Sequence, residues 1–374
     1  MTGMKGQVME YLVPDYYPSF HCKIGACRAV CCSGWPVTFS MKEYFRLLGV
    51  ECGAALRTRL DMALHLTERP TAEEYAMLLP RYDGECPLRQ SDGRCALQVE
   101  AGEDALPAVC RLYPRGVRAG ECGCANSCEA VVELLMARAE RLRFVPMRLP
   151  FEAPAGTRVH FFETGGREME IRMWLIGFIQ DRWYPLRRRL LWMGEALRRM
   201  DEALSNKDAG RVSALLSGRE AVEVPEASGD LPFALAAAEA ILRDLDSLSD
   251  SIRDYGEIAC ARFAAGDANG RERFEALCPD WERWFEHLLV NHMFFTQFPF
   301  QDRPVSLRDE ITALYAVYAM LRFLSIGAMD GTLARQADIA AALFRMVDHT
   351  AFDRYAVPIL RRQCGSRIDD LLAL

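Results

Sequence analysis

The stretch that decides the organisation of this chain is His21-Cys-Lys-Ile-Gly-Ala-Cys-Arg-Ala-Val-Cys-Cys-Ser-Gly-Trp35. It carries four cysteines at short spacing, and four more cysteines follow, each beside a turn signal. Clustered thiolates bind zinc or an iron–sulfur cluster, because both are soft, electron-poor centres that sulfur donors satisfy. We therefore predict a metal site formed from eight ligand candidates: Cys22, Cys27, Cys31, Cys32, Cys86, Cys95, Cys110 and Cys128.

The cysteines are distributed unevenly, and the remainder of the chain has a different pattern. Of 14 cysteines, only Cys260, Cys278 and Cys364 lie beyond residue 130. Apolar residues at helical spacing dominate from Met173 onward, whereas Val159–Glu163 and Met169–Met173 flank Gly165-Gly166 like a β-hairpin. The sequence thus predicts a mainly α protein with an irregular cysteine-rich metal-binding module over residues 1–145, a small β-hairpin connector over 146–172 and a helical domain over 173–374.

Composition and charge limit the classes of function. The net charge of −7 argues against nucleic-acid binding, which normally uses a basic surface. The N-terminus has no apolar segment typical of a secretory signal, and we see no run of about 20 apolar residues that would predict a membrane span. We expect a cytoplasmic protein without a membrane partner. In that reducing compartment, metal ligation is a better explanation of clustered cysteines than disulfides.

The spacing of the first four cysteines leaves the kind of metal open. It contains neither the paired C-x₂-C of zinc modules nor the C-x₃-C-x₂-C of radical S-adenosylmethionine enzymes. Eight thiolates are more than one four-ligand cluster needs, so the others are available for a second site or for packing. We favour one iron–sulfur cluster, with zinc as the alternative or as an addition.

Several blocks of sequence together resemble the flagellin lysine-N-methylases. Tyr16-Tyr17-Pro-Ser-Phe20 precedes the first cysteine group, and Cys86-Pro-Leu and Asp92-Gly-Arg-Cys95 follow it. Cys110-Arg-Leu-Tyr-Pro-Arg115 and Ser127-Cys-Glu-Ala130 complete the N-terminal pattern, and Asn291–Phe300 looks like the family's helical half. The cysteine signature is also similar to that of small proteins described as zinc- or iron-chelating.

The resemblance implies transfer of methyl groups from S-adenosylmethionine to lysine side chains of flagellin, in a protein with a [4Fe-4S] cluster. It carries metal ligation to the eight cysteines above without resolving which four bind the cluster. Cys122 and Cys124 depart from the family's pattern, as incidental residues or as competing ligands.

The catalytic residues are not identified by the sequence. Methyl transfer to an amine is an in-line displacement, and the chain lacks the glycine-rich loop of the common methyltransferase fold. Arg111 and Arg115 are candidates for binding the carboxylate of S-adenosylmethionine, although such arginines more often neutralise a thiolate cluster. His287 and His292, at i and i+5 of one predicted helix, are interpreted as packing or surface residues.

Two other functions remain open. A non-catalytic zinc- or iron–sulfur-binding protein, with an interaction or redox role, would also account for the cysteines and for the missing glycine loop. A methyltransferase acting on a protein amine other than flagellin would account for the same resemblance.

Overall fold

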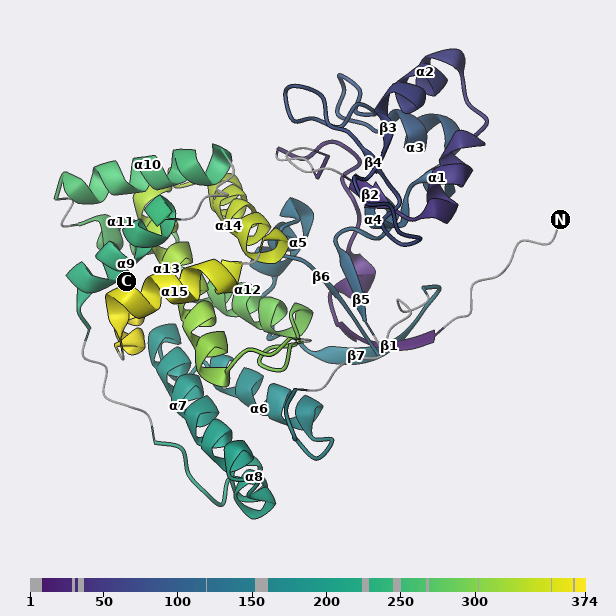
Figure 1. Ribbon diagram of the computed structural model, residues 1–374. Helices are drawn as coiled ribbons and strands as arrows, with labels where there is room; N and C mark the ends of the chain where they lie inside the picture. Colours follow the sequence, from purple (N-terminus) through teal and green to yellow (C-terminus); the bar gives the residue numbers. More distant parts are fainter. Residues whose placement is uncertain are drawn as a thin grey trace. The chain divides into compact units, whose positions relative to one another are not determined.

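The computed structural model describes residues 9–28, 31–32, 37–118, 120–151, 161–223, 229–244, 250–266, 269–301, 303–350, 352–365 and 367–374. The described chain is mainly helical, as predicted, with two small sheets (Figure 1). It divides into two compact units. The cysteine unit comprises Phe20–Gly116 and Cys128–Ala130, and the helical unit comprises Met1–Ser19, Val117–Ser127 and Val131–Leu374. The predicted boundaries at residues 145 and 172 follow sequence pattern rather than spatial contact, and they stay predictions.

The cysteine unit is built from short elements around a small apolar core. Its antiparallel sheet has the order β2-β4-β3, and Leu47, Leu60 and Leu97 are fully buried beside it. Its elements are β2 (Val37–Phe39), α1 (Met41–Leu48), α2 (Ala54–Ala63), β3 (Leu64–Leu66), β4 (Ala76–Leu78), α3 (Ala96–Ala101), the 3₁₀ turn η2 (Glu103–Ala105) and α4 (Ala108–Leu112).

One carboxylate fixes the start of two of these helices. Ser40 and Glu43 form a capping box at the N-terminus of α1, where helix N–H groups lack backbone partners. The other oxygen of Glu43 accepts a 2.6 Å hydrogen bond from the backbone N–H of Ala108, the first residue of α4. Burial acts to raise the pKa of Glu43, but these backbone hydrogen bonds lower it overall. The side chain therefore remains an anion that links α1 to α4.

The helical unit contains the long helices and most of a four-stranded sheet. The sheet order is β5-β6-β1-β7, with β1 parallel to β6 and antiparallel to β7. Its elements, together with those that lead into it from the cysteine unit, are β1 (Met9–Pro14), the turn η1 (Tyr17–Ser19), β5 (Arg115–Arg118), β6 (Glu121–Cys124), α5 (Glu129–Ala137), β7 (Phe144–Leu149), α6 (Glu168–Ile179), α7 (Leu186–Ser205), α8 (Ala209–Leu216), α9 (Leu231–Asp244), α10 (Asp250–Ala264), α11 (Gly270–Leu277), α12 (Trp281–Phe295), α13 (Leu307–Ala328), α14 (Leu333–His349), α15 (Phe352–Cys364) and η3 (Ile368–Ala373).

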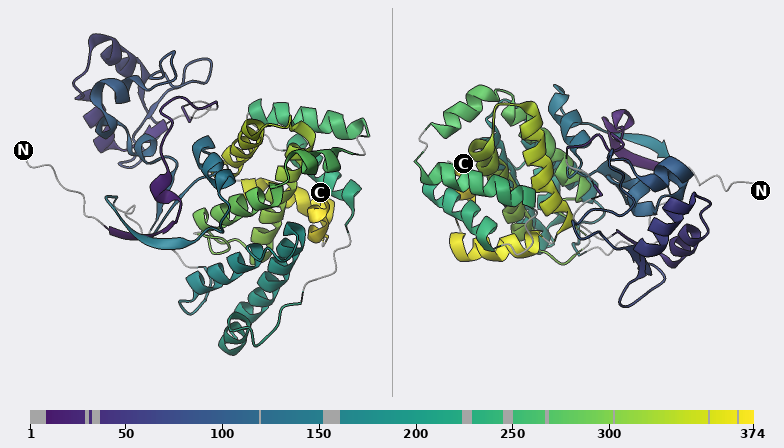
Figure 2. Two further views of the ribbon diagram at one scale, coloured as in Figure 1. Left: turned by 180° about the vertical axis from the view of Figure 1, so that it is seen from behind. Right: turned by 90° about the horizontal axis from the view of Figure 1, so that it is seen from above.

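Helix α13 is the core of the helical unit. It packs against α7, α9, α10, α11, α12, α14 and α15 (Figure 2). By length and composition α13 could cross a membrane, contrary to our sequence expectation, but 94% of its most apolar window is buried inside the protein. A core helix surrounded by other helices has the same composition, because its whole circumference is apolar.

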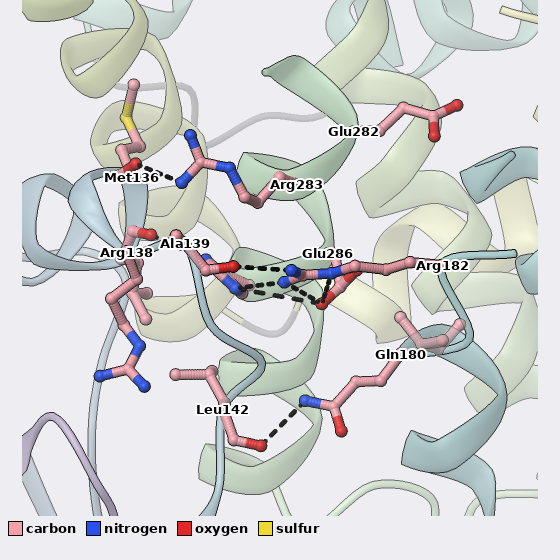
Figure 3. A network of polar contacts seen from close by, with 12 residues as sticks. Met136, Arg138, Ala139, Leu142, Gln180, Arg182, Glu282, Arg283 and Glu286 are labelled. Carbon is pink, nitrogen blue, oxygen red and sulfur yellow. Dashed lines mark hydrogen bonds and ion pairs between the residues drawn. The ribbon is translucent and has the colours of Figure 1, made fainter.

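A buried ion-pair network joins α12 to the segments packed around it (Figure 3). The carboxylate of Glu286, fully buried on α12, accepts a 2.6 Å hydrogen bond from Arg189 and a 2.8 Å hydrogen bond from Arg182. Arg182 also donates to the carbonyl oxygen of Ala139 at 2.6 Å. Its Nη2 lies 3.0 Å from Nε2 of His287, whose pKa is lowered by burial. His287 is therefore a structural residue, as predicted.

The predicted β-hairpin is wrong where the structure can be compared with it. Met169–Met173 lies in α6, and Ile171, Leu175 and Ile179 form a buried stripe at a helical spacing of four residues. Val159 and His160 of the other predicted strand lie outside the described residues, and 161–163 is not a strand. After α6, Pro185 precedes the first residue of α7, a favourable place for a residue that cannot donate a backbone hydrogen bond.

Candidate functional site

All eight predicted ligand cysteines belong to the cysteine unit. The chain returns to this unit after residue 116 only for Cys128-Glu129-Ala130, and so adds the eighth thiol. Five thiols form a first group, namely those of Cys31, Cys32, Cys86, Cys95 and Cys110. The sulfur atoms of Cys31 and Cys32 are 4.0 Å apart. The backbone N–H of Cys86 donates to the carbonyl oxygen of Cys32 at 2.8 Å, which holds the two cysteine segments together.

The electrostatics of this first group show that its thiols influence one another. A hydrogen bond with Cys31, followed by burial and the nearby sulfurs of Cys86 and Cys110, raises the pKa of Cys32. Burial, followed by the nearby Cys86, Cys95 and Cys31, raises the pKa of Cys110. Thiolates that repel one another in this way need a cation between them to be held deprotonated together.

A second group surrounds Cys27. Burial, followed by Glu129, Cys128 and Cys22, raises the pKa of Cys27 to about 11. The carboxylate of Glu129 is 1% exposed and lies 2.5 Å from the ammonium of Lys23. This ion pair connects the residue after Cys22 to Glu129, the residue immediately after Cys128.

Two glycines bring the cysteine-bearing turns into contact. Gly25 lies between Cys22 and Cys27, and Gly93 lies between Cys86 and Cys95. Both have positive φ, and a Cβ on either would collide with the backbone of the other. Only glycine fits such a close approach in this conformation. The contact explains why a Gly accompanies the cysteines in both segments.

The donor set suits a thiophilic metal in kind, since eight thiols are gathered in one unit. Within the described ranges, no group of three or more His, Cys, Asp or Glu side chains is arranged closely enough to hold a metal ion. Metal ligation by the eight cysteines thus stays a prediction, as does the choice between iron–sulfur and zinc.

The other residues singled out in the sequence are placed as follows. Arg111 lies in α4 beside Cys110, and the guanidinium of Arg115 stacks 5.0 Å from the ring centroid of Phe20. Their predicted role with S-adenosylmethionine stays a prediction. Cys122 and Cys124 are fully buried in β6, outside the cysteine unit, where they pack as core residues of the helical unit.

A pocket of about 310 Å³ opens among α12, α13, α14 and α15 in the helical unit. Each helix contributes one ionisable side chain: His292, Glu310, Asp348 and Asp353. Arg303, from the connection that precedes α13, also lines the pocket. Its apolar walls include Phe295, Phe298, Leu314, Val317 and Phe352. Concave, mostly apolar sites with a few converging polar groups are the usual form of a ligand site.

The charges within the pocket are only partly compensated. Arg303 lies 2.5 Å from Asp353 and 3.6 Å from Glu310. Burial raises the pKa of Glu310 to about 7, against the opposing effects of Gln301 and Arg303. On the opposite side, Nδ1 of His292 lies 3.3 Å from Asp348. Perturbed ionisable groups within a cleft are typical of functional sites.

Sequence reasoning missed this pocket and interpreted His292 as a packing or surface residue. The only signal was the aromatic run around His292, because the carboxylates come from three other helices. The C-terminal end of α12 lies beside the pocket. There the backbone N–H of Phe298 donates to the carbonyl oxygen of Met293, and Gln297 adopts a φ of 60°. This is the Schellman pattern, which reverses the chain direction directly after α12.

Comparison with known proteins bears on the segment that contains most of this pocket. The family model described as the FliB lysine N-methylase C-terminal domain matches residues 172–356. A lysine-N-methylase of Salmonella choleraesuis (strain SC-B67) is 29% identical over 102 residues, which is 27% of this chain and 25% of that protein. A lysine-N-methylase of Salmonella typhimurium (strain LT2) is 28% identical, with the same coverage.

A third relative has a flagellar name. The flagellar biosynthetic protein FliU of Salmonella muenchen is 28% identical over 102 residues, 27% of this chain and 60% of that protein. The match spans only about a quarter of the length of the two lysine-N-methylases. No solved structure gives a significant match. The predicted resemblance is confirmed by the family model and the named relatives, since residues 172–356, just under half of this chain, match the FliB lysine N-methylase C-terminal domain.

Proposed function

We propose that this protein transfers methyl groups from S-adenosylmethionine to lysine side chains of flagellin, and that its N-terminal cysteines hold a [4Fe-4S] cluster. The observation that carries the proposal is the position of the pocket. Its residues from His292 to Asp353 lie within residues 172–356, the segment that matches the lysine N-methylase family. The names of the relatives support lysine as the acceptor and the flagellum as the setting.

The chemistry needs little from the protein beyond placement and charge. A neutral amine displaces the methyl group of a sulfonium in line, so donor and acceptor must meet in near-attack geometry. The site must also favour the neutral amine, whose conjugate acid has a reference pKa near 10.4. A buried pocket with carboxylates and aromatic walls supports both requirements, because carboxylates bind the cation and rings tolerate its charge.

A cluster in the cysteine unit would be held by four of the eight cysteines. It would supply positive charge and covalent cross-links between cysteine-bearing segments that are far apart in the sequence. Ligand binding of this kind is coupled to folding, because the site does not exist in the unfolded chain. We propose a structural role for the cluster, or one in shaping the donor pocket.

The test of the activity is transfer of a labelled methyl group to flagellin of the same organism by protein purified without oxygen. Label on flagellin lysines supports the proposal, and its absence with metal-replete protein refutes it. Transfer to another protein of the host, with none to flagellin, would keep the enzyme and replace the substrate.

The test of the cluster is the content of iron and acid-labile sulfide. About four of each per chain are expected for a cubane. Cys110→Ala should lose part or all of this content, whereas Cys278→Ala, a buried cysteine of the helical unit, should retain it. Zinc without sulfide would replace the cluster by a zinc site.

The alternative is a non-catalytic metal-binding or redox protein. It is favoured by the separation of the cysteine unit from the matched segment 172–356, with which it shares no residue. Binding of S-adenosylmethionine to the purified protein, measured by calorimetry, would exclude this alternative.

A further inference from the structure

Asp348 is the least satisfied buried charge of the pocket. Its side chain is 1% exposed, and neither carboxylate oxygen has a hydrogen-bond partner. The histidine beside it is His292, whose Nδ1 lies 3.3 Å from Oδ1 of Asp348 and also lacks a hydrogen bond. A buried carboxylate without hydrogen bonds destabilises the fold, because it has lost water without replacing it. A ligand that donates hydrogen bonds to it would remove this penalty.

Asp348 accepts no hydrogen bond from either arginine that lines the pocket, Arg118 or Arg303. Arg303 is engaged with Asp353 and Glu310 on the other side. Glu310 accepts a 2.6 Å hydrogen bond from Gln301 through one oxygen, while its other oxygen has none. The pocket thus offers two buried carboxylates with unused acceptor positions, which suits a cation with several N–H donors.

The size and walls of the pocket narrow the kind of cation. About 310 Å³ lies at the small end of the range for ligand pockets and is enough for one unbranched side chain and a methyl group. Phe295, Leu314 and Val317 provide an apolar wall for a hydrocarbon stem. A lysine side chain combines a four-carbon stem with an ammonium group that has three donors. A sulfonium has no N–H donor and could not satisfy the carboxylates through its sulfur.

We propose that this pocket is the acceptor site, in which Asp348 and His292 bind the lysine ammonium and Asp348 takes its proton. This assignment rests on the proposed function. One N–H proton passes to the Asp348 carboxylate, and the freed lone pair forms the new N–C bond with the donor methyl group. The S–C bond breaks at the same time, so the sulfonium becomes a neutral thioether and the product nitrogen carries the positive charge.

The Asp348→Asn variant tests the assignment in the full chain. The Michaelis constant for flagellin should rise at least tenfold and kcat should fall, while the Michaelis constant for S-adenosylmethionine stays within twofold. The melting temperature should be unchanged or higher, because the substitution removes a buried charge that the fold does not satisfy. Asp338→Asn, on the same helix but outside the pocket lining, is the matched control and should keep normal kinetics.

Direct binding separates this assignment from the proposed function. Nα-acetyl-lysine methylamide at millimolar concentration should raise the melting temperature of the native protein and of Asp338→Asn, but not that of Asp348→Asn. This result would support the amine pocket even if flagellin were not methylated. Active enzyme with an unchanged Michaelis constant for flagellin in Asp348→Asn would refute the pocket and leave the methyltransferase in place. A large loss of stability in that variant would also refute it, since it would show a structural role.

Glu310→Gln provides a second variant from a different helix. It should weaken binding of the same lysine probe by severalfold, because one of the two acceptor carboxylates becomes neutral. Equal stabilisation of this variant and the native protein by the probe would count against the shared acceptor site.

Discussion

Replacing Glu286 by glutamine should destabilise the protein by about 3–5 kcal/mol, the cost of breaking a buried ion pair. The carboxylate is fully buried and accepts four hydrogen bonds from Arg182 and Arg189. A glutamine side chain keeps one oxygen, but its amide nitrogen would face an arginine N–H, so charge-assisted bonds worth about 1.5–3 kcal/mol each are lost. Arg189, which is 2% exposed, would keep only the partly exposed Glu282, 3.5 Å away, as its anion.

The measurement is equilibrium unfolding in urea, followed by tryptophan fluorescence, to which the buried Trp281 and Trp284 of the helical unit contribute. The expected loss is a large part of a total stability of about 5–15 kcal/mol. Glu282→Gln is the control on the same helix. Its side chain is 36% exposed and lies 3.5 Å from Arg189, so we expect a loss of about 1 kcal/mol or less. Equal losses in the two variants would refute the reasoning that burial sets the strength of this network.

The remaining predictions concern helix packing, pH and the glycine contact. Gly327→Ala should lower the free energy of unfolding in urea by about 1–3 kcal/mol, because the new Cβ would collide with Ala259 where α10 crosses α13. Gly177→Ala, which has open space for a Cβ, should raise the free energy of unfolding by about 0.5–1 kcal/mol. Because burial raises the pKa of Glu310 to about 7, the folded state binds this proton more tightly than the unfolded state. The free energy of unfolding should therefore rise by up to about 1.4 kcal/mol per unit as pH falls from 7 towards 4.5, and Glu310→Gln should remove this contribution. Gly93→Ala should separate the two cysteine-bearing turns and lower the metal content measured after purification, while Gly84→Ala, also at positive φ but without close neighbours, should leave the metal content unchanged.

Features set by neighbouring residues could be predicted from the sequence. The start of helix α1 is one such feature, because Ser40 and Glu43 cap it locally. The helical region after residue 173 follows from apolar spacing in the same way, and Pro185 lies between α6 and α7. The grouping of the cysteines was indicated by their number, and the structure places all eight in one unit.

Features that depend on distant residues could not be predicted. β1 has no local sign of its partners, which lie in β6 and β7. The apolar residues of Met169–Met173 alternate well enough for a strand, and only burial against other helices selects the helical period. The pocket combines one ionisable side chain from each of four helices, and each residue in isolation has the appearance of an ordinary surface charge.

The position of β1 in its sheet has a consequence for how the chain folds. β1 precedes the other strands of its sheet in the sequence, yet its antiparallel partner is β7, and Tyr11 donates a hydrogen bond to Phe151 across 140 residues. Closing such a long loop costs entropy before any contact rewards it, and non-local strand pairing is slow for this reason. The cysteine unit lies between these partners in the sequence and can collapse earlier around its local turns. We expect the sheet to be completed late in folding, and a nascent chain to carry β1 with one exposed edge, lacking its β7 partner, until residue 149 has left the ribosome.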